Sequence, residues 1–130
     1  MIVVDASALI EVLLRTPAAK AVEDRLFAPQ QTLHAPHLID LEVAQVIRRL
    51  AMHREIAGKR GRDALSDLAD FPLWRYPHDS LLARIWDLRG NLTAHDAAYV
   101  ALAEALDAPL LTRDKRLASA AGHRARIELA

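Results

Sequence analysis

Four carboxylates stand at the ends of predicted secondary-structure elements. Asp5 follows a short β-branched stretch, Glu42 lies early in a helical segment, Asp96 lies where another helix begins, and Asp114 follows an apolar stretch. In open parallel sheets, sites form beyond the carboxyl ends of the strands. If the strands beside these acids are neighbours, we expect all four carboxylates to converge at one edge of the sheet.

Such convergence predicts a bound divalent cation. Two carboxylates about 4 Å apart repel by roughly 4 kcal/mol at an effective dielectric constant near 20, and a cation removes that penalty. Oxygen ligands in a chain without cysteine suit Mg²⁺ or Mn²⁺. A metal held this way orients a phosphodiester, activates a water molecule and stabilises developing negative charge, so the pattern favours phosphoryl chemistry.

Each acid also has a local interpretation. Thr93 to Asp96 has the spacing of a capping box, with Thr93 as N-cap and Asp96 at the third helical position. Asp5 and Asp114 could be simple N-caps, and Glu42 could be a solvated residue at the edge of its helix. Only their joint placement at matching junctions favours a shared site.

Strands alternate with helices along the chain, which predicts an α/β fold with a central parallel sheet and helices on both faces. The pattern favours one domain over residues 1–130. Expected strands are Ile2–Val4, Thr32–Ala35, Leu73–Tyr76, Pro109–Thr112 and Arg126–Leu129. Expected helices are Ala8–Leu14 with Ser7 as its cap, Ala18–Phe27, Leu38–His53, Arg62–Asp70, Ser80–Leu88, Ala94–Leu106 and Lys115–Ala121.

Two of these helices carry specific expectations about burial. The segment Ala94–Leu106 is apolar on nearly every side and should be covered all round. In Arg62–Asp70, Leu65 and Ala69 are expected to face inward beside Ala64 and Leu68. The large aromatic residues Trp74, Trp86 and Tyr99 fit the core or an interface better than a platform for stacked bases.

The basic residues have two interpretations. Net charge is zero and the pI is about 7.0, so the whole-chain charge gives no support for polyanion binding. A local run over residues 48–62, which includes Arg48, Arg49 and Arg54, is either a solvated helix face or a surface that tracks phosphates. Arg113, Lys115 and Arg116 surround Asp114 and could hold phosphates there.

Composition sets outer bounds. The 52% hydrophobic content excludes a disordered chain, and the absence of cysteine excludes disulfides, zinc–thiolate sites and thiol nucleophiles. No apolar run approaches the roughly 20 residues that span a bilayer, and the start MIVVDAS is unlike a signal peptide. These features favour the cytoplasm.

The sequence resembles the PIN-domain ribonucleases, and within them the VapC-type toxins of toxin–antitoxin modules. The resemblance covers essentially the whole chain and rests on IVVDASALIEVLL, LIDLEVAQVIRRL and NLTAHDAAYVALAEALDAPLLTRDKRLA. It implies a three-layer α/β/α sandwich, cleavage of RNA with Mg²⁺ or Mn²⁺, a homodimer, and an antitoxin partner whose inserted segment blocks the site, often with an arginine.

The resemblance also implies residue roles. The family's acids map to Asp5, Glu42, Asp96 and Asp114, with Asp5 and Asp96 as direct metal ligands. Its hydroxyl groups fall on Ser7 and Thr112, which would orient carboxylates through hydrogen bonds. Many relatives carry Tyr where this chain has His95, and some carry a further acid after the fourth, which this chain lacks.

Two other functions remain open from the sequence. A small-molecule phosphatase would use a sheet-end aspartate as nucleophile, but the usual Asp-x-Asp start is here Asp5-Ala6-Ser7. A non-catalytic binding module on the same fold would have little reason to keep four acids. The endoribonuclease toxin is the leading hypothesis.

Overall fold

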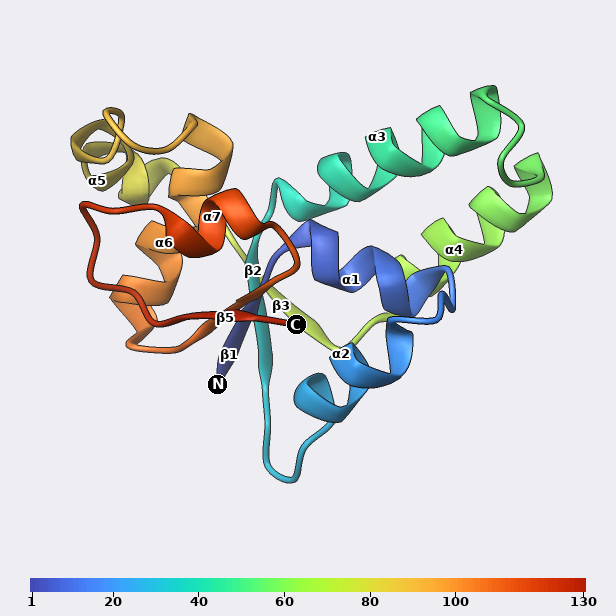
Figure 1. Cartoon of the computed structure of the whole chain (residues 1–130), viewed down its shortest axis with the longest axis horizontal. Coiled ribbons are helices and arrows are strands. Elements are labelled where there is room, and N and C mark those ends of the chain that lie inside the picture. Colours follow the sequence, from blue (N-terminus) through green and yellow to red (C-terminus); the bar gives the residue numbers. More distant parts are fainter.

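A five-stranded parallel sheet forms the centre of the molecule, in a computed structural model that describes all 130 residues (Figure 1). The strand order is β3-β2-β1-β4-β5. The strands are β1 (Ile2–Val4), β2 (Leu33–Pro36), β3 (Leu73–Tyr76), β4 (Leu110–Thr112) and β5 (Ile127–Leu129). β1 pairs with β2 on one side and β4 on the other, and its three residues are fully buried, as expected for a central parallel strand covered on both faces.

Helices cover both faces of this sheet. They are α1 (Ala6–Leu13), α2 (Ala19–Leu26), α3 (Ile39–Met52), α4 (Gly58–Asp70), α5 (Leu82–Asp87), α6 (Ala94–Leu106) and α7 (Lys115–Ser119), with a 3₁₀ turn at Asp79–Leu81. Figure 1 shows α1 and α2 on one side and α5 and α6 on the other, while α3 and α4 form a hairpin that extends away from the sheet. The predicted three-layer α/β/α architecture is confirmed.

Helix α6 packs across the centre of the sheet. Every residue from 97 to 103 is buried, which confirms the expectation of a helix covered all round. The small alanine side chains on this helix let it approach β1 and β2 closely while α5 covers its other side. Its N-terminal end is thereby held beside the carboxyl ends of β1 and β2.

The start of α1 differs from the prediction. The helix begins at Ala6, so Ser7 lies inside its first turn and Asp5 takes the N-cap position with an extended backbone. The Ser7 hydroxyl donates to the side chain of Asp5 and accepts from the backbone N–H of Arg113, so it accepts from no N–H group in the first turn of α1. The predicted serine cap is therefore wrong, because a nearby buried carboxylate is the better hydrogen-bond acceptor for this hydroxyl.

Helix α4 also differs, because it begins at Gly58 and runs through Gly61 instead of starting near residue 62. Gly61 is buried against α3, and a Cβ atom placed there would lie 3.0 Å from Cγ2 of Ile47. The glycine thus permits close packing of the hairpin rather than ending the helix. Because Gly61 sets the buried face, Leu65 and Ala69 point to solvent, contrary to the prediction.

Two remaining expectations can be compared with the structure. The segment predicted as one helix over Ser80–Leu88 is divided into the 3₁₀ turn and α5. Tyr99 lies in the core as expected, whereas Trp74 and Trp86 are each 65% exposed and do not. No helix combines the length and the apolar character needed to cross a bilayer.

Candidate active site

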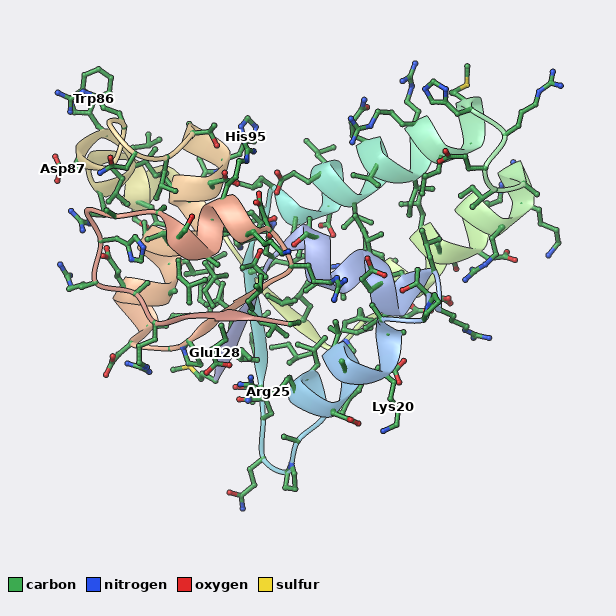
Figure 2. All side chains as sticks on the ribbon, in the orientation of Figure 1. Lys20, Arg25, Trp86, Asp87, His95 and Glu128 are labelled. Atoms are coloured by element: carbon green, nitrogen blue, oxygen red, sulfur yellow. The ribbon has the colours of Figure 1, made fainter.

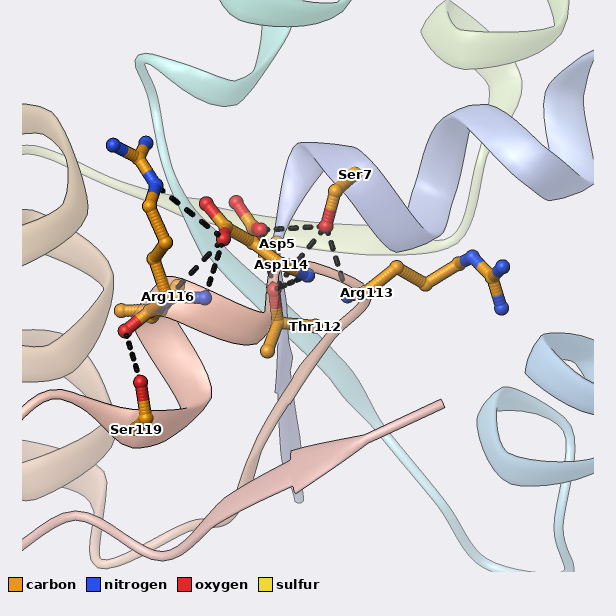
Figure 3. Close-up of polar contacts among 8 residues, drawn as sticks. Asp5, Ser7, Thr112, Arg113, Asp114, Arg116 and Ser119 are labelled. Atoms are coloured by element: carbon orange, nitrogen blue, oxygen red, sulfur yellow. Dashed lines mark hydrogen bonds and ion pairs between the residues drawn. The ribbon is translucent and has the colours of Figure 1, made fainter.

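Asp5 stands at the carboxyl end of the central strand and is 7% exposed. The hydroxyl groups of Ser7 and Thr112 both donate to its Oδ2, over 2.7 Å and 2.8 Å (Figure 3). The two hydroxyl oxygens are 3.2 Å apart, so they form one small network with the carboxylate. Because β1 and β4 are neighbours, Thr112 at the end of β4 comes within reach of Asp5. Neither hydroxyl donates to Oδ1.

Asp114 follows β4 and lies beside Asp5 in Figure 3. Its Oδ1 accepts from the backbone N–H groups of Arg116 and Leu117, so the predicted N-cap role is confirmed for the start of α7. Its own backbone N–H donates to Oγ1 of Thr112 over 3.0 Å. The capping contacts therefore hold this carboxylate at the same sheet edge as Asp5, and the local role does not compete with a place in the site.

Glu42 projects from the first turn of α3 toward α6. Its Oε1 accepts a short hydrogen bond from the hydroxyl of Tyr99, which is itself fully buried. The side chain is half-buried, so the interpretation of Glu42 as a solvated edge residue is wrong. The tyrosine connects the helix after β2 to the helix before β4.

Asp96 lies in the first turn of α6, where Thr93 is the N-cap. The Thr93 hydroxyl accepts from the backbone N–H of Asp96 over 3.2 Å, which confirms the threonine half of the predicted capping box. The carboxylate of Asp96 is directed into the cleft that Asp5, Glu42 and Asp114 also line. All four predicted acids are therefore brought to one place.

Burial and mutual repulsion raise the pKa of three of these acids. For Asp5 the main cause is burial, opposed by the hydrogen bonds from Ser7 and Thr112 and reinforced by the charge of Asp96. Burial also raises the pKa of Glu42, opposed by the hydrogen bond from Tyr99 and reinforced by the charge of Asp5.

The same balance applies to Asp96 and to the tyrosine. Burial raises the pKa of Asp96, the Thr93 hydroxyl lowers it, and the charge of Asp114 raises it again. Burial first, and then the Glu42 charge, raises the pKa of Tyr99 far above its usual range. The phenol therefore stays protonated and remains a donor, while the acids sense one another's charge and disfavour full ionisation.

The acids line an open cleft of about 620 Å³ between α3 and the N-terminal ends of α1, α6 and α7. Two of the predicted basic residues, Arg49 and Arg116, also line it. Arg116 is 89% exposed, and its Nε atom lies 3.9 Å from Oδ1 of Asp114. The cleft thus combines a carboxylate floor with guanidinium groups at its rim.

The other predicted basic residues are not brought to the cleft. Arg48, Arg54 and Lys115 are exposed elsewhere. Arg113 turns away from Asp114 (Figure 3). Its guanidinium lies 3.6 Å from Glu11 and donates to the carbonyl of Ala130 over 3.1 Å. A substrate contact from Arg113 would require it to leave both partners.

The donor set fits a divalent cation held largely by water. No three His, Asp or Glu side chains in the chain lie close enough together to hold one ion as a group. Mg²⁺ usually keeps several waters and takes only one or two protein carboxylates, so a wider acidic cleft suits it. The charge of Asp96 raises the pKa of Asp5, and the charge of Asp114 raises the pKa of Asp96, so a cation in the cleft would lower the cost of ionising these acids.

Two residues of the site were not identified from the sequence. Tyr99 was assigned to the core, but its hydroxyl reaches Glu42. Gln45 lines the cleft one turn after Glu42. The spacing contained a signal for both, since positions three apart on a helix share a face. Tyr99 follows Asp96 by three positions, and Gln45 follows Glu42 by three.

Sequence comparison supports the family suggested by these residues. The PIN domain family model matches residues 2–123. The chain is 47% identical over 117 residues to Ribonuclease VapC9 of Mycobacterium tuberculosis, covering 90% of this chain and 88% of that protein. It is 43% identical over 129 residues to Ribonuclease VapC12 of the same organism, covering 99% and 98%.

Solved structures share the fold. VapBC2 from Rickettsia felis, bound to a DNA fragment from its promoter, aligns with a TM-score of 0.71 at 14% identity, covering 100% of this chain and 99% of that one. A toxin–antitoxin complex from Klebsiella pneumoniae aligns with a TM-score of 0.63 at 22% identity, covering 92% and 91%. The full-length similarity in sequence, together with a sheet edge that gathers four carboxylates, leads to one conclusion. The chain belongs to the PIN-domain family, among the VapC-type ribonucleases of toxin–antitoxin systems.

Proposed function

We propose that this chain hydrolyses RNA phosphodiester bonds in the cleft lined by Asp5, Glu42, Asp96 and Asp114. The observation that carries the proposal is the convergence of four carboxylates from β1, α3, α6 and the β4–α7 junction on one cleft. Three of them have a raised pKa because of burial and mutual repulsion. An arrangement that costs stability in this way indicates selection for a bound cation and a phosphate substrate.

Asp5 and Asp96 would hold a Mg²⁺ or Mn²⁺ ion. Glu42 and Asp114 would hold its water molecules or bind a second ion, because no three of the acids lie close enough together to hold one ion. When bound, a divalent ion orients the phosphodiester, lowers the pKa of the attacking water and neutralises charge in the transition state.

The chain's own residues would position these groups. Ser7 and Thr112 hold Oδ2 of Asp5, which leaves Oδ1 to face the cleft. Tyr99 holds the Glu42 carboxylate against α6, where it can accept a hydrogen bond from the attacking water. Arg49 and Arg116 at the rim would contact phosphates of the RNA, because a guanidinium pairs with phosphate oxygens in a bidentate manner.

The proposal extends to partners. A cognate antitoxin would inhibit the enzyme by placing an arginine in the acidic cleft, and the toxin would act as a homodimer in the cytoplasm. The antitoxin is supported by the acids of the cleft and by the solved toxin–antitoxin complex that shares this fold, whereas the homodimer and the cytoplasm are expectations from the family. Coexpression with a small, adjacently encoded protein should relieve growth inhibition. If that protein neither binds nor relieves it, the toxin role fails even where the nuclease role holds.

The deciding experiment compares the parent with Asp5→Asn. The protein is induced in cells and new RNA ends are mapped, and the purified protein is assayed on the same RNA with Mg²⁺ or with excess EDTA. We expect cleavage by the parent with metal only, and none by Asp5→Asn. Asp24→Asn, an exposed acid on α2, is the matched control and should cleave like the parent. Equal cleavage in EDTA, or by Asp5→Asn, would contradict the proposal.

A further inference from the structure

A second, apolar pocket adjoins the active-site cleft. It has a volume of about 260 Å³ and lies between α5, the N-terminal half of α6 and the start of α3. Its walls include Leu38, Leu82, Ile85 and Ala94. No Asp, Glu, Lys or Arg side chain lines it, in contrast to the acidic and basic cleft beside it.

The two cavities share part of their walls. Leu38 and His95 line both of them, so a ligand in the cleft would lie next to the mouth of the pocket. In Figure 2, His95 projects from the N-terminal end of α6 on the side that faces α3. A second imidazole, His78, lies on the loop after β3 and also lines the pocket. The apolar walls therefore carry two groups that can pair with polar ring edges.

We propose that this pocket receives one nucleobase of the RNA, from a nucleotide next to the scissile phosphate. The proposal rests on the function proposed above and assigns a specificity site to it. A nucleobase combines flat apolar faces with hydrogen-bonding edges, and sequence-specific RNA recognition places unstacked bases in pockets of this kind. Phosphate groups would stay in the cleft with Arg49 and Arg116, because no Lys or Arg side chain lines the pocket.

The pocket's size and position limit what can occupy it. At about 260 Å³ it is smaller than a typical site for a drug-sized ligand, which is about 300–1,000 Å³, so it suits a single base. Leu82 on its wall is 55% exposed, so the pocket is open to solvent and a flexible single strand can reach it. His95 at the boundary can stack on the base or bond its edge.

The test replaces one base at a time by an abasic nucleotide. The cleavage site of the parent is first mapped on a short RNA, and abasic nucleotides are then placed at each position around the cut. We expect kcat/KM in Mg²⁺ to fall at one position by about 5- to 150-fold, the range for loss of one stacked base. An abasic nucleotide at any other position should change kcat/KM much less.

Two variants connect that position to the pocket. Ala94→Leu fills the pocket from an exposed position in the first turn of α6, so the fold should be retained. In this variant the natural RNA should be cleaved about as slowly as the parent cleaves the critical abasic RNA, with no further loss from the abasic site. Ala105→Leu, the same change at an exposed position at the other end of α6, is the control and should keep the parent's sensitivity.

Each outcome decides a separate point. If the parent cleaves RNA but no abasic position matters, or if Ala94→Leu stays as sensitive as the parent, the base pocket is wrong while the nuclease assignment stands. If the parent cleaves no RNA in Mg²⁺, the proposed function fails, and the pocket assignment fails with it. Should Ala94→Leu not fold, Leu82→Trp fills the same pocket from α5, and the same comparison between natural and abasic RNA is made with that variant.

Discussion

Replacing Asp96 by Asn separates a metal site from a helix cap. The structure assigns the capping contact to the Thr93 hydroxyl and the Asp96 backbone, so Asn at position 96 keeps that bond. What changes is the charge facing Asp5 and Asp114. Like charges this near one another repel by a few kcal/mol at most at an effective dielectric constant near 20.

Metal-free Asp96→Asn should therefore be as stable as the parent or more stable by up to a few kcal/mol. The pH dependence gives the same sign. Because the folded pKa of Asp96 is raised above its ordinary value of 3.8, the folded state holds the proton longer than the unfolded chain. The parent's free energy of unfolding should fall as pH rises through the window between those two values, and the variant should lose less there.

Metal should reverse the order. A cation at 100 times its dissociation constant stabilises the parent by about 2.7 kcal/mol and should stabilise Asp96→Asn much less. For a chain of this size, a gain of that free energy corresponds to a rise in the parent's Tm on the order of 10 °C. The assay is a urea titration of each protein in EDTA and in millimolar Mg²⁺ or Mn²⁺.

Two control variants sharpen the comparison. Thr93→Ala should lose about 0.5–2 kcal/mol in both conditions, because it removes the cap but no charge. Asp24→Asn changes an exposed acid on α2 and should leave the gain from metal unchanged. Suppose that Asp96→Asn is less stable than the parent in EDTA and that metal increases its free energy of unfolding by as much as the parent's. Asp96 then only stabilises the start of α6, and the metal site is misassigned.

Three further outcomes follow from individual contacts. Tyr99→Phe removes the donor to Glu42 without a change of volume, so kcat for RNA cleavage should fall about 10-fold or more, and an unchanged kcat would show that the bond is only structural. Glu104 has its pKa lowered to about 2, chiefly by the hydrogen bonds from Arg84. Its stabilisation is present above its ordinary value of 4.5 and is lost as pH falls toward 2, by up to about 3 kcal/mol. Glu104→Gln should lack that component in urea titrations from pH 7 to 2, and an identical pH profile would contradict it. Arg49→Ala should reduce the slope of log affinity for RNA against log salt by about one, more than Arg48→Ala does, and equal slopes would remove Arg49 from the phosphate contacts.

Local pattern was enough to predict most elements of the fold. Short segments bounded by residues such as Asp and Pro predicted the strands, of which only Ile2–Val4 is a β-branched run, and a continuous apolar segment predicted α6 with its observed bounds. The acids could be placed at strand ends and helix starts as well, because the residues next to a junction in the sequence determine where a strand ends and a helix begins. The start of α4 was predicted too late, near Arg62, because the close packing that Gly61 permits depends on Ile47, a residue of another helix.

Tertiary structure alone decided which of these junctions meet. Asp5, Thr112 and Asp114 come together only because β1 lies between β2 and β4, and strand order depends on long-range packing that no local window contains. The same holds for the bond from Tyr99 to Glu42, which joins residues 57 positions apart. It holds for Arg113 as well, which sequence places beside Asp114 and the fold turns toward Glu11. Residue types and spacing determined the kinds of groups available for chemistry, and packing across the sheet determined which of them can act together.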